Sequence, residues 1–250
     1  MATSPSGATA REARTVVVLA ATAPVIFEAN DPDGDDHGPG NFQYPTSDAF
    51  HSGAFDLEQF QVLDTGDTVT FRVRLRDLSP TFGSPNGAQL IDLYVHDPAA
   101  SSTSTAASFP QRNYRISDAG AWSRLLEVQG FGQRFVDASG NTLGTISIRA
   151  DDISRYITFS VPRSALGNPG PGWAFTVTLT AQDGFEPDQA RAFTSTPEGF
   201  KLGRCAAESA EPHCTFPLNQ LPKVMDTLSA PGELDYTVHD PVTLSPVVVP

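Results

Sequence analysis

Hydrophobic and polar positions alternate along several short segments of this chain. The pattern has no break in Thr68-Val-Thr-Phe-Arg-Val-Arg-Leu75, and the same period of two recurs in 157–161 and 174–181. Successive side chains of a β-strand point to opposite faces of its sheet, so this pattern predicts strands with one buried face and one solvated face.

A second kind of segment is more continuously apolar. Leu90-Ile-Asp-Leu-Tyr-Val95 favours a central strand that is covered on both faces. Further strands are expected at 15–19, 25–27, 55–63, 125–128 and 145–148, and turn-forming residues separate nearly all of these segments. Eight or more short strands at this spacing predict an all-β fold, an antiparallel, jelly-roll-like β-sandwich with long loops. One helical turn is expected at Ser164–Leu166.

The chain is expected to hold one domain. Its 250 residues fit a single large β-domain with short arms. Residues 1–14 are largely small and polar and predict a disordered tail or linker, 15–240 predict a single β-sandwich binding domain, and 241–250 predict an extended C-terminal arm.

The charge of the chain narrows the classes of partner. Sixteen Lys and Arg against 29 Asp and Glu give a formal net charge of −13. Such a surface repels phosphate backbones, so nucleic-acid binding is not expected, and it attracts cations such as calcium.

The segment after Arg14 faintly resembles a signal peptide, but its apolar run is short and Pro24 follows the would-be cleavage site, so a strand at 15–19 is favoured. No run of 18 apolar residues is present, and no membrane span is expected.

The two cysteines, Cys205 and Cys214, lie in one irregular stretch. A disulfide between them is the preferred interpretation, and it indicates an extracellular, cell-surface or periplasmic location. Two free thiols are the alternative. A zinc site that includes His213 is less favoured, because adjacent His213 and Cys214 cannot easily both face one ion.

The most unusual segment is Asn30-Asp-Pro-Asp-Gly-Asp-Asp-His-Gly-Pro-Gly40. Carboxylates packed this closely repel one another, and a hard cation removes that cost. The hypothesis is a calcium site whose candidate ligands are Asp31, Asp33, Asp35 and Asp36, with Asp183 as a later ligand from another loop. The spacing does not match an EF-hand, which needs glycine at position six and glutamate at position twelve. An exposed acidic turn is the alternative.

A series of motifs in a fixed order resembles a known family. The acidic segment is followed by Phe42-Gln-Tyr-Pro-Thr46 and Gly53-Ala-Phe-Asp-Leu57, then by Pro85-Asn-Gly87, the strand at 89–94, Arg112-Asn113, Trp122 and Gln182-Asp-Gly-Phe185. Together they resemble the C-terminal, S-layer-homology-like binding module of glucodextranase, also found in pullulanases and other bacterial surface proteins. The resemblance covers roughly residues 25–200.

This resemblance implies a β-sandwich related to carbohydrate-binding modules, on an exported protein. A polysaccharide or cell-wall glycan is the partner it favours, and S-layer or other envelope proteins are the alternative. One departure concerns Thr81-Phe82-Gly83, where many relatives carry a tryptophan, so a stacking contact is expected to be weaker there.

Glycan binding usually needs an aromatic platform flanked by polar groups. The candidate ligand-binding residues are Trp122, Arg112 and Tyr94. No Gly-x-Ser-x-Gly, HExxH or Walker motif is present, and 29 acids are too many for the sequence to select a catalytic pair. The expectation is therefore a binding module and not an enzyme; a small histidine metalloenzyme is the least favoured hypothesis.

Overall fold

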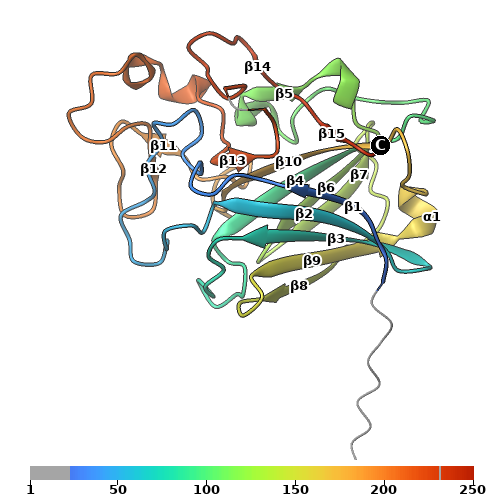
Figure 1. Cartoon of the computed structure of the whole chain (residues 1–250). Helices are drawn as coiled ribbons and strands as arrows, with labels where there is room; N and C mark the ends of the chain where they lie inside the picture. Colours follow the sequence, from blue (N-terminus) through green and yellow to red (C-terminus); the bar gives the residue numbers. More distant parts are fainter. Residues whose placement is uncertain (1–22, 231) are drawn as a thin grey trace, which may run out of the picture.

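The structure is a computed structural model that describes residues 23–230 and 232–250. Two antiparallel sheets pack face to face, with few and short helices (Figure 1). The β-sandwich predicted from the alternating pattern is confirmed. The strand expected at 15–19 and the tail at 1–14 lie outside the described residues.

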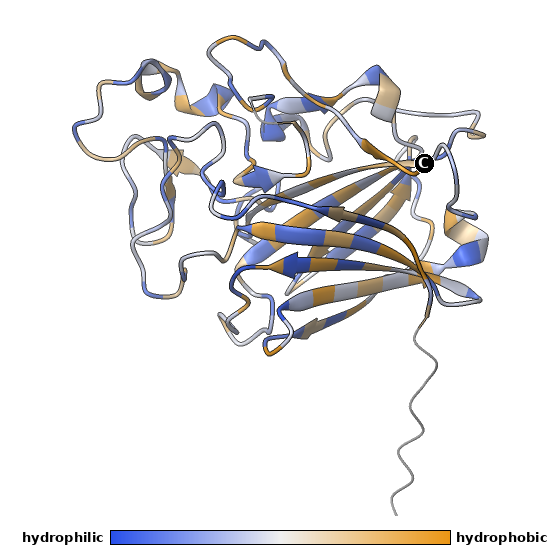
Figure 2. Cartoon of the chain, in the orientation of Figure 1, coloured by the Kyte–Doolittle hydropathy of each residue, from blue (hydrophilic) through white to orange (hydrophobic). Residues whose placement is uncertain are grey.

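The first sheet has five strands in the order β1-β2-β3-β9-β8. Their bounds are β1 (Val25–Asn30), β2 (Leu57–Asp64), β3 (Thr68–Leu75), β8 (Ser147–Asp151) and β9 (Tyr156–Pro162). Buried and partly exposed residues largely alternate along β3 and β9. The same alternation is visible as orange and blue bands on the front sheet (Figure 2).

The second sheet has six strands, with the central order β13-β10-β4-β6-β7 and β15 also pairing with β10. Their bounds are β4 (Gln89–His96), β6 (Arg124–Gln129), β7 (Gln133–Asp137), β10 (Ala174–Ala181), β13 (Asp226–Thr227) and β15 (Val247–Val248). Every residue of β10, and every residue of β4 except His96, is buried. The central strand expected at 90–95 is thus confirmed.

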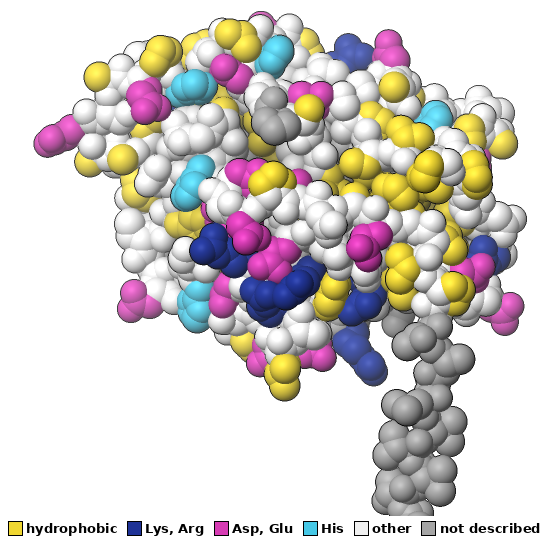
Figure 3. All heavy atoms as spheres, in the orientation of Figure 1, with side chains coloured by type: hydrophobic (Ala, Val, Ile, Leu, Met, Phe, Trp, Pro, Cys, Tyr) yellow, Lys and Arg dark blue, Asp and Glu magenta, His cyan; other side chains and the backbone are white. Residues whose placement is uncertain are grey.

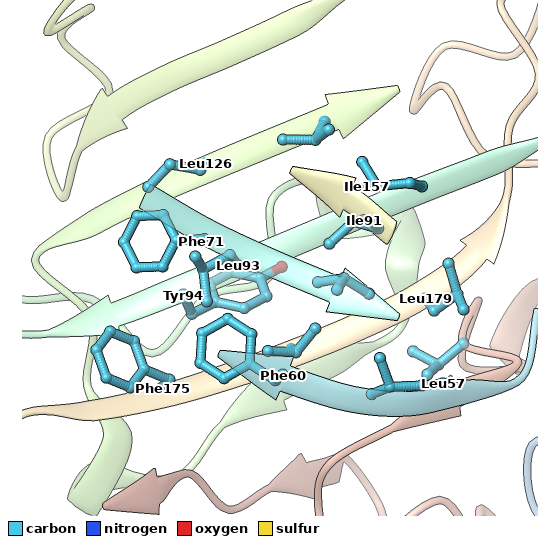
Figure 4. Packing of buried hydrophobic residues seen from close by; sticks show 14 of the residues in the cluster. Leu57, Phe60, Phe71, Ile91, Leu93, Tyr94, Leu126, Ile157, Phe175 and Leu179 are labelled. Carbon is cyan, nitrogen blue, oxygen red and sulfur yellow. The ribbon is translucent and has the colours of Figure 1, made fainter. Parts of the chain in front are cut away.

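Aromatic rings from both sheets meet between the two layers. Phe175 of β10 lies 5.4 Å from Phe60 of β2 and 6.1 Å from Phe71 of β3, measured between ring centroids (Figure 4). Each ring is fully buried. Burying side chains of this size contributes most of the favourable free energy of a sandwich core.

The outer face of the six-stranded sheet is also covered. Long loops lie over it, with β5 (Tyr114–Ile116) paired to β14 (Val242–Leu244) and β11 (Phe193–Thr194) paired to β12 (Leu202–Gly203) (Figure 1). Helix α1 (Arg163–Leu166) and short 3-10 turns complete the fold; the turns are Pro110–Arg112, Asp118–Gly120, Pro212–Thr215 and Leu218–Gln220. Residues 241–250, expected as an arm, contribute β14 to this cover and β15 to the six-stranded sheet itself.

Candidate metal centre

The acidic segment forms a loop that is fastened to two distant parts of the chain. Its Gly38 N–H donates a hydrogen bond to the carbonyl of Met225 at 2.7 Å, and its Gly34 N–H donates to Asp56 Oδ2 at 2.9 Å. Gly38 has a φ of +57°, and a Cβ there would lie 2.4 Å from the Phe42 ring. A glycine is therefore required where the loop turns against Phe42.

Folding brings three carboxylates together at this loop. Oxygens of Asp31, Asp35 and Asp226 all lie within 4.8 Å of one another. Asp31 and Asp35 come from the loop, whereas Asp226 begins β13 and is only 3% exposed. The group borders a cavity of about 600 Å³ whose walls are the loop, residues 226–230, Gly232 and Leu234.

The electrostatics of this group favour a cation. Burial, followed by repulsion from Asp35, raises the pKa of Asp31 well above its ordinary 3.8. Burial, followed by repulsion from Asp31, raises the pKa of Asp226 in the same direction. The raised pKa values mean that the charged carboxylates repel one another and are poorly solvated where the fold holds them. A bound cation would offset this free-energy cost.

The donor atoms fit a hard cation. Asp226 accepts hydrogen bonds from the N–H groups of Leu57 and Thr227, each at 2.7 Å, which fixes the orientation of its carboxylate. Asp31 Oδ2 is buried and has no hydrogen-bond partner among the described residues. Oxygen-only donors and an unsatisfied buried oxygen suit calcium better than a metal that prefers nitrogen or sulfur.

Asp56 supports the loop from outside the group of three. It accepts the Gly34 hydrogen bond and pairs with Arg76 at 3.3 Å. Burial, then repulsion from Asp36, raises the pKa of Asp56 to about 6. The carboxylate thus links the loop to the chain just before β2.

The other aspartates expected as ligands lie elsewhere. Asp33 is exposed in the same loop, and Asp36 is buried and accepts a hydrogen bond from the Tyr44 hydroxyl. Asp183 pairs with Arg191 at 3.2 Å in another loop. The structure therefore groups Asp31 and Asp35 of the expected set, and it adds Asp226, which sequence reasoning missed.

The three residues expected to bind a ligand lie inside the protein. Tyr94 and Arg112 are fully buried, and Trp122 is 6% exposed with its indole N–H donating to the Ala106 carbonyl at 2.8 Å. Arg112 lies over the outer face of the six-stranded sheet, near Asp92 and Glu127. None of the three presents an open aromatic or cationic surface, because the long loops cover this face of the sheet.

The outer face of the five-stranded sheet is charged. Basic side chains gather there with acidic ones among them (Figure 3). Glu58 pairs with Arg74 at 3.0 Å and with Arg155 at 3.2 Å. Paired charges of this kind contribute solubility, and they leave no broad aromatic platform on these strands.

The Cys205–Cys214 disulfide is formed, with the two Cα atoms 5.7 Å apart. Cys205 is buried, and Asn41 lies against it while donating a hydrogen bond to Tyr236 at 2.9 Å. The disulfide thus closes a loop that packs on the segment just after the acidic loop. A formed disulfide is consistent with an oxidising, extracellular location.

We expect the Cys205→Ser/Cys214→Ser double variant to lose about 2–3 kcal/mol of unfolding free energy, because the crosslink restricts the unfolded chain. Urea denaturation followed by tryptophan fluorescence measures this loss. The native protein unfolded in dithiothreitol is the control and should match the variant. Equal stability of the oxidised protein and the variant would contradict the expectation.

Together, the fold and the acidic group define a class: a β-sandwich domain with a candidate cation site. The chain belongs to the family described as the C-terminal, SLH-like binding module of glucodextranase, which it matches over residues 26–242. The resemblance inferred from the ordered motifs is therefore confirmed. No curated protein matches the chain. Within the described residues, no helix has the length and apolar character needed to cross a membrane.

Proposed function

We propose that this chain is a calcium-stabilised module that binds polysaccharide or cell-wall glycan on an exported protein. The main support for the proposal is that the chain is a β-sandwich and belongs to a family of binding modules. The family is described by an enzyme that acts on carbohydrate, so a glycan is the partner this membership favours. The disulfide supports a location outside the cytoplasm, at the cell surface or in the periplasm.

Calcium has a structural role in this proposal. Asp31, Asp35 and Asp226 would hold the ion, and its charge would offset the repulsion among the three carboxylates. The acidic loop and β13 would then be joined through the metal as well as through the Gly38 hydrogen bond. Fixing this end of the sandwich keeps neighbouring loops in one arrangement, which lowers the entropic cost of binding a ligand.

Co-sedimentation with insoluble glycans tests the binding function. Cross-linked dextran, starch, cellulose and purified bacterial cell walls are incubated with the protein in calcium or in EGTA. We expect the protein to pellet with at least one of them in calcium, and to be retained less in EGTA. Absence from every pellet would contradict the proposal.

A structural role in the cell envelope is the second candidate. The family description names a likeness to S-layer-homology modules, and the net charge of −13 suits calcium-bridged assembly. This alternative predicts calcium-dependent oligomers in size-exclusion chromatography and no retention on purified glycans. The same two assays therefore separate the two functions.

A further inference from the structure

Four phenylalanines surround a hollow at the end of the sandwich where β4 begins and β10 ends. They are Phe82, Phe131, Phe185 and Phe200, with exposed fractions of 43%, 55%, 101% and 54%. The hollow has a volume of about 610 Å³, within the range of small-ligand sites. Large apolar side chains gathered in this way on a surface indicate a binding site.

The strand register explains why these residues meet. Gln89, which begins β4, pairs with Ala181, which ends β10, and Leu90 pairs with Gln129, which ends β6. The loops before β4, after β6 and after β10 therefore leave the same end of the sheet. Each carries one of the phenylalanines, and Phe200 comes from the turn between β11 and β12.

The loops are held in place before any ligand binds. Ser84 Oγ donates a hydrogen bond to the Gly130 carbonyl at 3.1 Å, which joins the Phe82 loop to the Phe131 turn. A Cβ at Gly87 would lie 1.9 Å from the Thr81 carbonyl oxygen, so only glycine allows this close approach. Phe82 has a φ of 55°, an unusual conformation for a bulky residue and one that concentrates at ligand-binding sites.

The base of the hollow is polar. Gln182 lines it and is 4% exposed. Arg191 lies 4.7 Å from the centroid of the Phe50 ring and 5.6 Å from that of Phe82, and it pairs with Asp183. A side-chain amide at the base of an apolar hollow can donate hydrogen bonds to, and accept them from, the hydroxyl groups of a ligand.

We propose that this hollow binds the pyranose rings of a neutral polysaccharide chain, an inference that rests on the glycan-binding function proposed above. The apolar faces of pyranose rings match the phenylalanine rings, and ring hydroxyls match the Gln182 amide and the Asp183 carboxylate. The net charge of −13 and the pairing of Arg191 with Asp183 disfavour an anionic chain.

Calorimetric titration with soluble oligosaccharides tests this site. The probes are hexasaccharides from dextran, starch and cellulose, titrated into the full chain in calcium. Phe185→Ala removes the most exposed ring and Gln182→Ala removes the buried amide, while Val238→Ala is a matched control at a 71% exposed apolar residue outside the hollow. We expect each of the first two to weaken binding about tenfold or more, and the control to bind like the native protein.

The outcomes separate this site from the broader function. If the native protein binds a probe and both hollow variants bind equally well, glycan binding stands and the hollow is not its site. If the native protein binds no hexasaccharide, the hollow proposal is overturned, and the pelleting assay alone decides the broader glycan-binding function. If the native protein self-associates and Phe185→Ala is monomeric, a second copy occupies the hollow and the glycan site is overturned. Thermal melting of Phe185→Ala should match the native protein, because its side chain is fully exposed.

Discussion

Replacing Arg112 with methionine is expected to lower the free energy of unfolding by about 3–5 kcal/mol, because removing one partner leaves buried charge uncompensated. The Arg112 guanidinium is fully buried and lies 3.5 Å from Asp92, 3.6 Å from Glu127 and 3.6 Å from Asp188. It also donates two hydrogen bonds to the Asp188 carbonyl, at 2.7 and 3.2 Å. Equilibrium denaturation in urea measures the loss.

Arg115→Met is the matched control for this change. Arg115 pairs with Asp118 at 3.3 Å, but the Asp118 side chain is 93% exposed. Exposed pairs contribute about 0–1 kcal/mol, so the control should be nearly neutral. Equal losses in the two variants would contradict the view that Arg112 compensates a buried acidic group.

The pH dependence adds a second signature of this group. Burial, then repulsion from Asp92, raises the pKa of Glu127 to about 7. Without Arg112 this pKa rises further, so the folded state binds more protons than the unfolded state. Stability then falls as the pH rises from the unfolded pKa near 4.5 through the folded pKa. The difference between Arg112→Met and the native protein should therefore be larger at pH 8 than at pH 5.

Calcium at about 1,000 times its dissociation constant is expected to stabilise the native protein by about 4.1 kcal/mol. For a domain of this size the melting temperature should rise by about 8–16 °C. Asp226→Asn should abolish most of this rise, because it removes the most buried carboxylate of the three. Asp33→Asn, the same charge change at an exposed residue of the acidic loop, should keep most of it.

The stabilisation by calcium should also depend on pH. The raised pKa values of Asp31 and Asp226 determine whether it grows or shrinks as the pH rises. Without calcium, the folded protein binds more protons than the unfolded chain above the ordinary pKa of 3.8, so its stability falls as the pH rises through the folded pKa values. Calcium requires the deprotonated carboxylates. The calcium-induced rise in melting temperature should thus be small at pH 5 and large at pH 8.5. An equal rise at both pH values would contradict the assignment.

The long strands could be predicted from the sequence because their side chains alternate or form an apolar run. Segments 68–75, 157–161 and 174–181 lie in β3, β9 and β10. The short strands β5 and β11 to β15 were not predicted, because two or three residues carry no period. β13 and β15 form only by pairing with β10, and the other four lie in the long loops outside the two main sheets.

The residues of the candidate sites were harder to predict from the sequence than the long strands. Asp31 and Asp35 stand out in an acidic run, but Asp226 joins them only because β13 pairs with β10, and no local pattern marks it. Trp122 and Tyr94 look like binding aromatics in the sequence, yet covering loops bury them. The four phenylalanines of the hollow lie in four separate loops, and only the register of the sheet brings them together.

Glycan binding in the presence and absence of calcium tests the central claim most directly. The native chain is incubated with cross-linked dextran, starch, cellulose and bacterial cell walls, and the bound fraction is measured in calcium and in EGTA at pH 7.5. We predict saturable binding to at least one glycan in calcium, weaker binding in EGTA, and no release of soluble sugar. A calcium-loaded, folded protein that binds none of them would contradict the account.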